Sequence, residues 1–84
     1  MDELDERVIG CLGWSSHRLS DRQVADALGR PLDAVRSALV RLMELGLVGK
    51  GHSYLDNDPV GEEEYGLTDK GRREFERLAE LESD

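Results

Sequence analysis

The side chains that most often perform catalysis or bind metal ions are sparse in this 84-residue sequence. There is one cysteine, Cys11, and there are two histidines, His17 and His52. Their spacing does not place a nucleophile beside a base, and no glycine-rich loop is present to hold a phosphate group. A single cysteine also excludes an internal disulfide and a cysteine zinc cluster, so Cys11 is expected to be a small core residue. We therefore expect a protein that is not an enzyme and uses neither cofactor nor metal.

An acidic stretch, residues 56–64, is the other segment with potential metal chemistry. Its order of carboxylates and the position of Gly61 fail the pattern of a calcium-binding loop. A solvated acidic loop explains this stretch better than a cation site does.

The charge of the chain is unevenly distributed. A formal net charge of −8 argues against a partner such as DNA, whose phosphates repel an acidic protein. Residues 7–54, however, carry seven basic and four acidic side chains, whereas residues 1–6 and 55–65 are acidic without a basic residue. A basic region on an acidic body is typical of a local nucleic-acid footprint.

The types of charged residue indicate a protein adapted to concentrated salt. Only Lys50 and Lys70 are lysines, whereas the other basic residues are arginines and acidic residues are in excess. This composition resembles proteins of salt-accumulating microbes, particularly halophilic archaea. In molar salt the Debye length falls to about 3 Å, so repulsion between carboxylates has little effect on stability. We expect the fold to loosen in dilute buffer.

The chain length allows one small domain, and no repeat, linker or low-complexity tract divides residues 1–84. No apolar run approaches the length of a membrane span, and the acidic first turn does not resemble a signal peptide. We expect a soluble, cytoplasmic, single-domain protein with no membrane partner.

Apolar periodicity predicts two helices in the first third of the chain. The first spans about residues 2–12, and Trp14 follows it as a partly buried anchor. The second begins after Ser20, which forms a capping box with Gln23. Gly29 suits the left-handed residue that closes this helix. The turn to the next helix is therefore only a few residues long.

The third helix, about residues 31–45, is the most clearly amphipathic. Three apolar side chains fall within about 60° of Val35 around its axis, namely Ala38, Leu39 and Leu42. The opposite side carries Asp33, Arg36, Ser37, Val40, Arg41 and Glu44. One side therefore faces the core, and the other is polar.

A hairpin and a last helix complete the predicted elements. Residues 47–55 and 64–67 form its strands, and Tyr54 and Tyr65 suit pairing across them. Thr68 then caps a helix over about residues 69–81. A short second helix joined by a tight turn to a longer third is the helix-turn-helix arrangement.

Two segments resemble a known class of regulators. Residues 39–48, LVRLMELGLV, resemble the end of the recognition helix and the first wing strand of winged-helix regulators. Residues 65–71, YGLTDKG, resemble the Y-x-L-T-x-x-G motif that leaves the wing and opens the final helix. Both segments are similar to the MarR and PadR groups and to small archaeal winged-helix proteins. The resemblance covers residues 4–81 and implies an α+β winged helix-turn-helix fold, with a three-helix bundle, a two-stranded β-hairpin wing and a C-terminal helix.

The resemblance implies sequence-specific binding of double-stranded DNA to control transcription, with the third helix in the major groove. Arginine makes bidentate contacts to guanine, and an apolar group contacts the thymine methyl. The implied contact residues of this helix are Arg36, Ser37, Val40 and Arg41. Those of the preceding turn and the wing base are Ser20, Arg22, Arg30, Lys50 and His52.

Two alternatives remain open at this point. The polar side of the third helix could be an ordinary solvated face, with Arg41 paired to a nearby acid such as Glu44. The whole domain could instead be a protein-interaction module whose acidic surface meets a basic partner without binding DNA, since its wing tip is acidic where a basic wing is usual. The DNA-binding interpretation requires Arg36 and Arg41 to be free of internal ion pairs.

The resemblance also implies a homodimer. The apolar stripes of the first and last helices are the natural contact surface, because a small core gains stability from the contact. Two third helices would then meet half-sites about 34 Å apart. The chain lacks the additional dimerisation helices of larger family members, which leaves little room for a small-molecule effector.

Overall fold

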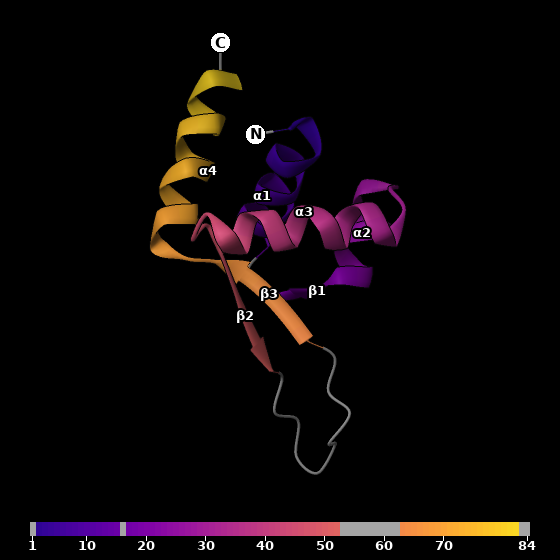
Figure 1. The fold of residues 1–84 in the computed structure, drawn as a ribbon. Helices are drawn as coiled ribbons and strands as arrows, with labels where there is room; N and C mark the ends of the chain where they lie inside the picture. Colours follow the sequence, from indigo (N-terminus) through magenta and orange to yellow (C-terminus); the bar gives the residue numbers. More distant parts are fainter. Residues whose placement is uncertain (1, 16, 53–62, 83–84) are drawn as a thin grey trace.

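The computed structural model describes residues 2–15, 17–52 and 63–82. Its elements, in chain order, are α1 (Glu3–Trp14), β1 (Leu19–Ser20), α2 (Asp21–Leu28), α3 (Leu32–Glu44), β2 (Val48–His52), β3 (Glu63–Leu67) and α4 (Asp69–Glu82). Figure 1 shows α3 running across the front of the helices, the strands of the wing below it, and α4 standing beside α1. This arrangement confirms the predicted α+β winged helix-turn-helix fold.

The sheet has three strands, one more than the predicted hairpin. All pairs are antiparallel, in the order β1-β3-β2. Tyr65 pairs with Leu19 of β1 on one side and with Lys50 of β2 on the other. The expected partner Tyr54 and the expected turn over residues 56–61 lie outside the described residues. The strand β1 is only two residues long, too short for the alternation by which a strand is recognised.

The end of α1 differs from the prediction. The helix continues through Gly13 to Trp14, and Trp14 is 81% exposed, so its expected partial burial is wrong. The reason lies in α4, because a Cβ at position 13 would collide with the ring of Phe75. The absence of a side chain at Gly13 lets Phe75 pack against α1. The Trp14 ring contacts the Phe75 ring edge to face, with 5.6 Å between the two ring centroids.

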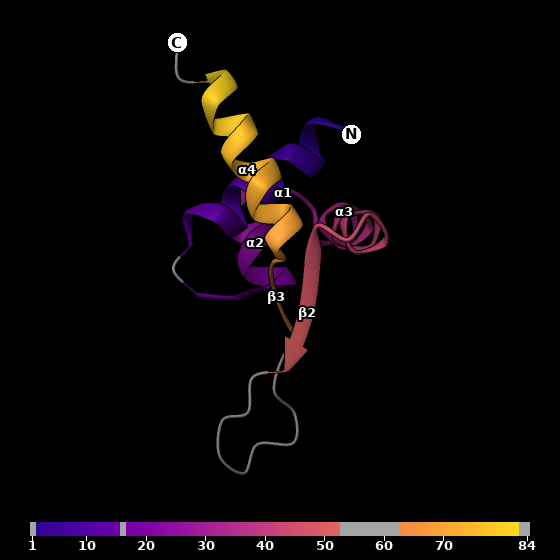
Figure 2. The ribbon, with the colours of Figure 1, turned by 90° about the vertical axis from the view of Figure 1, so that its left-hand side faces the viewer.

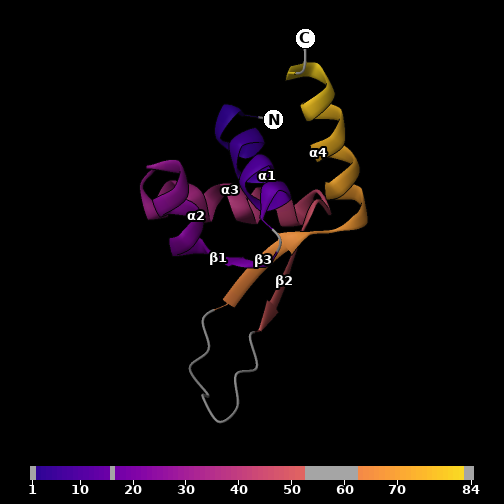
Figure 3. The same ribbon diagram turned by 180° about the vertical axis from the view of Figure 1, so that it is seen from behind.

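The core lies where α1, α2 and α3 meet. The predicted apolar side of α3 is confirmed, since its four members, Val35, Ala38, Leu39 and Leu42, are all buried. They pack with Val8 and Ile9 of α1 and with Val24 of α2, which are fully buried. Figure 3, the view from behind, shows α1 lying against α3. The packing leaves the opposite side of α3 outside the core.

Local signals set the limits of α2 as predicted. The Gln23 N–H donates to the Ser20 hydroxyl oxygen at 3.2 Å, and the Ser20 N–H donates to the Gln23 side-chain oxygen at 2.9 Å. Gly29 closes the helix with a φ of 64°. The short turn that follows leads directly into α3.

The motif over residues 65–71 fastens α4 to the end of α3. The Thr68 hydroxyl donates to the Gly46 carbonyl at 2.6 Å and accepts the Gly71 N–H at 3.0 Å. Gly46 itself has a φ of 77°, which favours glycine. The Lys70 ammonium donates to the Leu45 carbonyl at 3.0 Å. These bonds satisfy carbonyls that the end of a helix leaves without partners.

Candidate nucleic-acid interface

The side of α3 that is turned away from the core runs along one edge of the molecule. Figure 2, which looks along α3, shows this edge beside the wing. Four exposed residues follow one another there at helical spacing, and we call them the outer stripe: Asp33, Ser37, Val40 and Glu44. Val40 is 49% exposed. The outer stripe is thus a surface with two carboxylates, one hydroxyl and one apolar side chain.

Arg41 flanks the outer stripe but is held by α1. Its Nη2 lies 2.8 Å from Asp5 Oδ1 and its Nε lies 3.4 Å from Asp5 Oδ2. The Asp5 side chain is only 4% exposed, and it also accepts the Asp2 N–H at 3.3 Å. The hydrogen bond to Asp5 raises the pKa of Arg41. Withdrawing Arg41 would leave a buried carboxylate without its counter-charge.

The expectation that Arg41 is free of internal ion pairs is therefore wrong. Its partner is not Glu44, the nearby acid considered from the sequence, but Asp5, which lies 36 positions away in the chain. Arg41 is a structural residue that joins α3 to the first turn of α1.

Arg36, on the other flank, is also paired, contrary to the prediction, but its partner is more accessible. Its Nε donates to Asp21 Oδ2 at 2.8 Å, and the two side chains are 53% and 19% exposed. Burial raises the pKa of Asp21, but the hydrogen bonds and charges of Arg36 and Arg22 outweigh this and lower it. Exposed pairs of this kind contribute little to stability. Arg36 can therefore exchange Asp21 for another anion more readily than Arg41 can exchange Asp5.

The predicted contacts of the second helix and the turn differ in exposure. Ser20 is 2% exposed, and its hydroxyl accepts the Gln23 N–H as the cap of α2. Arg22 is exposed in the first turn of α2. Arg30 is exposed in the turn before α3, and it forms no ion pair with any residue in the described part of the chain.

The predicted wing contacts lie on β2. Lys50 is exposed, and its backbone lies opposite Tyr65 in the β2–β3 register. The side chain of His52 is not among those that the structure describes. A further exposed cation, Arg18, precedes β1. Its side chain crosses Gly51 and Gly66, where a Cβ at either glycine would crowd it. No local sequence pattern indicates this contact, because the three residues come from separate parts of the chain.

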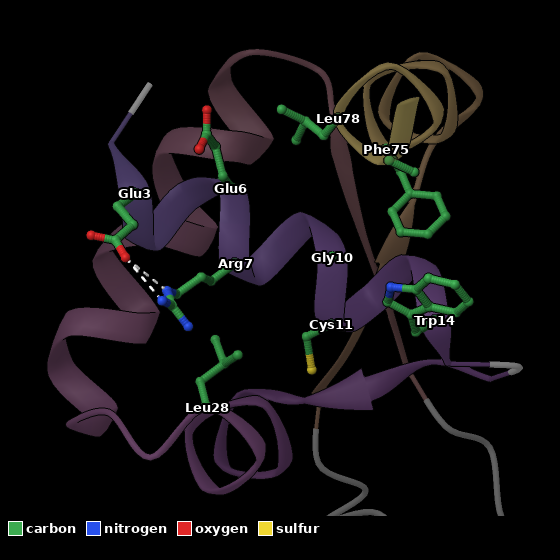
Figure 4. A pocket seen from close by; sticks show the side chains of 10 residues that line it. Glu3, Glu6, Arg7, Gly10, Cys11, Trp14, Leu28, Phe75 and Leu78 are labelled. Atoms are coloured by element: carbon green, nitrogen blue, oxygen red, sulfur yellow. Dashed lines mark hydrogen bonds and ion pairs between the residues drawn. The ribbon is translucent and has the colours of Figure 1, made fainter. Parts of the chain in front are cut away.

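A cavity of about 630 Å³ opens between α1 and α4. Figure 4 shows Cys11 and Trp14 of α1 on its wall opposite Phe75 and Leu78 of α4. Burial raises the pKa of the Cys11 thiol, which is half-buried on this wall and packs against the core. The volume lies within the range of small-molecule sites. The structure therefore has a space beside α1 and α4 that the sequence did not indicate.

The described residues lack the ligand cluster of a metal site and the long apolar helix of a membrane span. Residues 2–15, 17–52 and 63–82 contain no group of three metal-ligating side chains. Over the same ranges, the helices are too short or too polar to cross a bilayer.

No family model matches the sequence, and no curated protein matches it. Several solved structures share its fold. FabT of Streptococcus pneumoniae, solved in complex with DNA, has a TM-score of 0.83 and 21% identity, and the match covers 98% of this chain and 55% of FabT. ZitR of Lactococcus lactis has a TM-score of 0.82 and 21% identity, with 95% of this chain and 51% of ZitR covered.

A third structure with this fold is MepR, a transcription regulator of the Staphylococcus aureus multidrug efflux pump MepA. It has a TM-score of 0.80 and 22% identity, with 96% of this chain and 57% of MepR covered. The chain spans about half the length of these three proteins. At this level of identity, the likeness establishes the winged-helix fold.

Proposed function

We propose that this chain is a sequence-specific DNA-binding domain of a transcription regulator, with α3 in the major groove, and not an enzyme. The observation that supports the proposal most directly is the uncovered outer stripe of α3 beside the wing. FabT has the same fold and was solved with DNA, and MepR is a transcription regulator. An exposed helix of this length fits the major groove of a duplex.

The ion pairs of Arg36 and Arg41 contradict the condition on which the sequence-based assignment depended, so the proposal rests on the fold and on other exposed residues. Ser37 and Val40 lie on the outer stripe, where base edges would meet them. Arg22 of α2, Arg30 of the turn before α3 and Lys50 of β2 are exposed, and they would supply positive charge for phosphates. Arg36 would join them by leaving Asp21, and His52 keeps its proposed place at the wing base. Arg41 acts only through the position of α3.

Replacing Arg30 by alanine tests the proposal, because Arg30 has no described ion pair to lose. We expect weaker binding to all duplexes and a salt slope, log affinity against log salt, that is smaller by about one. Fluorescence anisotropy with a labelled mixed-sequence duplex measures both. Arg72→Ala removes the same charge from an exposed position on α4 and serves as the control, with no expected change in the slope.

The titration should include potassium chloride up to molar concentration, with circular dichroism at each step. We propose that the acidic composition is an adaptation to concentrated salt, so the protein must be shown to be folded where binding is measured. A folded wild-type protein that binds no duplex at any salt concentration would refute the DNA-binding proposal.

One observation favours a second candidate function, a protein-interaction module. The outer stripe carries Asp33 and Glu44, and both flanking arginines are paired with carboxylates. This side of α3 would suit a basic protein partner if the wild-type protein fails to bind DNA in the titration.

We also propose a homodimer formed through α1 and α4. Trp14 is 81% exposed at the mouth of the cavity, and Leu81 near the end of α4 is 65% exposed. Burying such side chains against a second copy would add to the small core of the domain. A two-fold axis at this surface would place two α3 helices on successive turns of the duplex.

Sedimentation of Trp14→Ala tests the dimer. Buried tryptophans at the centre of an interface often contribute 2 kcal/mol or more, so we expect the dissociation constant to rise about 30-fold. Leu45→Ala removes another exposed apolar side chain, 49% exposed at the end of α3, and should leave the constant unchanged. Equal dissociation constants for the two variants would place the interface elsewhere.

A further inference from the structure

The outer stripe has an unusual chemistry for a DNA-reading surface. Its polar groups are the carboxylates of Asp33 and Glu44 and the hydroxyl of Ser37, and its apolar group is Val40. Arginine, the residue that most often contacts guanine, is present only on the flanks. There Arg41 is bound to the buried Asp5, so it cannot turn to a base without leaving that carboxylate unpaired.

The edges of the base pairs differ in what they offer such a surface. In the major groove, cytosine presents the N4 amino group as a donor and thymine presents its methyl group. Adenine presents the N6 donor beside the N7 acceptor, which disfavours a carboxylate, and guanine presents only the acceptors N7 and O6. A carboxylate accepts a hydrogen bond from cytosine N4 and is repelled by the guanine acceptors. A valine side chain packs against the thymine methyl.

We propose that α3 recognises cytosine through Asp33 and thymine through Val40, and that it does not recognise guanine through Arg41. The inference rests on the proposed DNA binding. Asp33 and Val40 are seven residues apart, which is about 10 Å along the helix axis. Base pairs are stacked about 3.4 Å apart, so the two side chains would contact different base pairs of the half-site.

Concentrated salt favours this mode of recognition. With a Debye length of about 3 Å, repulsion between Asp33 and the surrounding phosphates is largely screened. A hydrogen bond to cytosine and a methyl contact act at shorter range and persist. The acidic composition of the chain and the acceptor character of the outer stripe are therefore compatible under the same condition.

Selection of binding sites from a randomised duplex library tests the role of Asp33. The wild-type protein should enrich cytosine at one position of the half-site. Asp33→Asn should change that position to adenine, because an asparagine amide contacts adenine N6 and N7. The ratio of adenine to cytosine at that position should rise by about tenfold or more. Asp26→Asn removes an exposed carboxylate from α2 and should leave the selected sequence unchanged.

Replacing the selected thymine by deoxyuridine tests the role of Val40, since only the methyl group is lost. We expect the affinity of the wild-type protein to fall about fourfold, the effect of one buried methyl group. The affinity of Val40→Ala should fall much less, because alanine does not reach the methyl group.

Three results would overturn the inference. The first is an Asp33→Asn variant that selects the wild-type sequence. The second is a selected guanine whose preference is lost in Arg41→Lys, a variant that retains the positive charge near Asp5. The third is a wild-type protein that enriches no sequence at all, which would refute the proposed function as well. The second result would refute the inference and leave DNA binding intact.

Discussion

Gly71→Ala should lower the free energy of unfolding by about 1–3 kcal/mol, as overpacking of a filled site does. Gly71 is buried at the start of α4, and a Cβ there would collide with the backbone carbonyl of Leu47. That carbonyl is fixed, because it accepts the Thr68 N–H at 3.1 Å. A side chain could rotate away from the new methyl group, but this backbone cannot do so without moving α4.

Thermal unfolding followed by circular dichroism measures the loss, since 1 kcal/mol corresponds to about 4–8 °C for a domain of this size. Gly10→Ala is the matched control. Gly10 is also helical, and a Cβ there meets nothing within 4 Å, so the substitution should stabilise the protein by about 0.5–1 kcal/mol. A Gly71→Ala protein as stable as the wild type would show that α4 does not pack against Leu47 as described.

Arg41→Ala should destabilise the fold several times more than Arg7→Ala. Both substitutions remove an arginine from an ion pair, and the Arg7 pair with Glu3 has an Nη2–Oε1 distance of 2.9 Å. The Glu3 side chain is 72% exposed, whereas that of Asp5 is 4% exposed. Water can replace Arg7 beside Glu3, but loss of Arg41 leaves a buried charge without a counter-charge.

The double variant Asp5→Asn, Arg41→Ala distinguishes this cause from a simple loss of packing. Removing the charge of the carboxylate should restore part of the stability lost in Arg41→Ala, because a neutral amide is less unfavourable in the interior. Chemical denaturation of the four proteins completes the cycle. Additive losses would show that the Asp5 charge and Arg41 do not interact.

Those parts of the fold that depend on neighbouring residues were predictable from the sequence. The Ser20 capping box, the left-handed Gly29 and the core side of α3 each rest on residues within a few positions of one another. Local backbone geometry fixes such features, so a spacing rule identifies them. The start of α4 at Thr68 belongs to the same class.

The candidate site was less predictable, because tertiary contacts decide which side chains are available. The spacing of α3 correctly put Asp33, Arg36, Arg41 and Glu44 on the polar side, but the ion pairs that occupy both arginines involve other helices. The exposure of Trp14 has the same origin, since Phe75 of α4 packs against Gly13 of α1 and Trp14 lies outside this contact.

The two sides of α1 have different neighbours, and this links two distant surfaces. Near its start, Asp5 holds Arg41 of α3, while Gly10 and Cys11 form the wall of the cavity beside α4. A rigid helix transmits a tilt along its length. Whatever enters that cavity and displaces α1 must therefore either carry α3 with it or break the bond between Asp5 and Arg41.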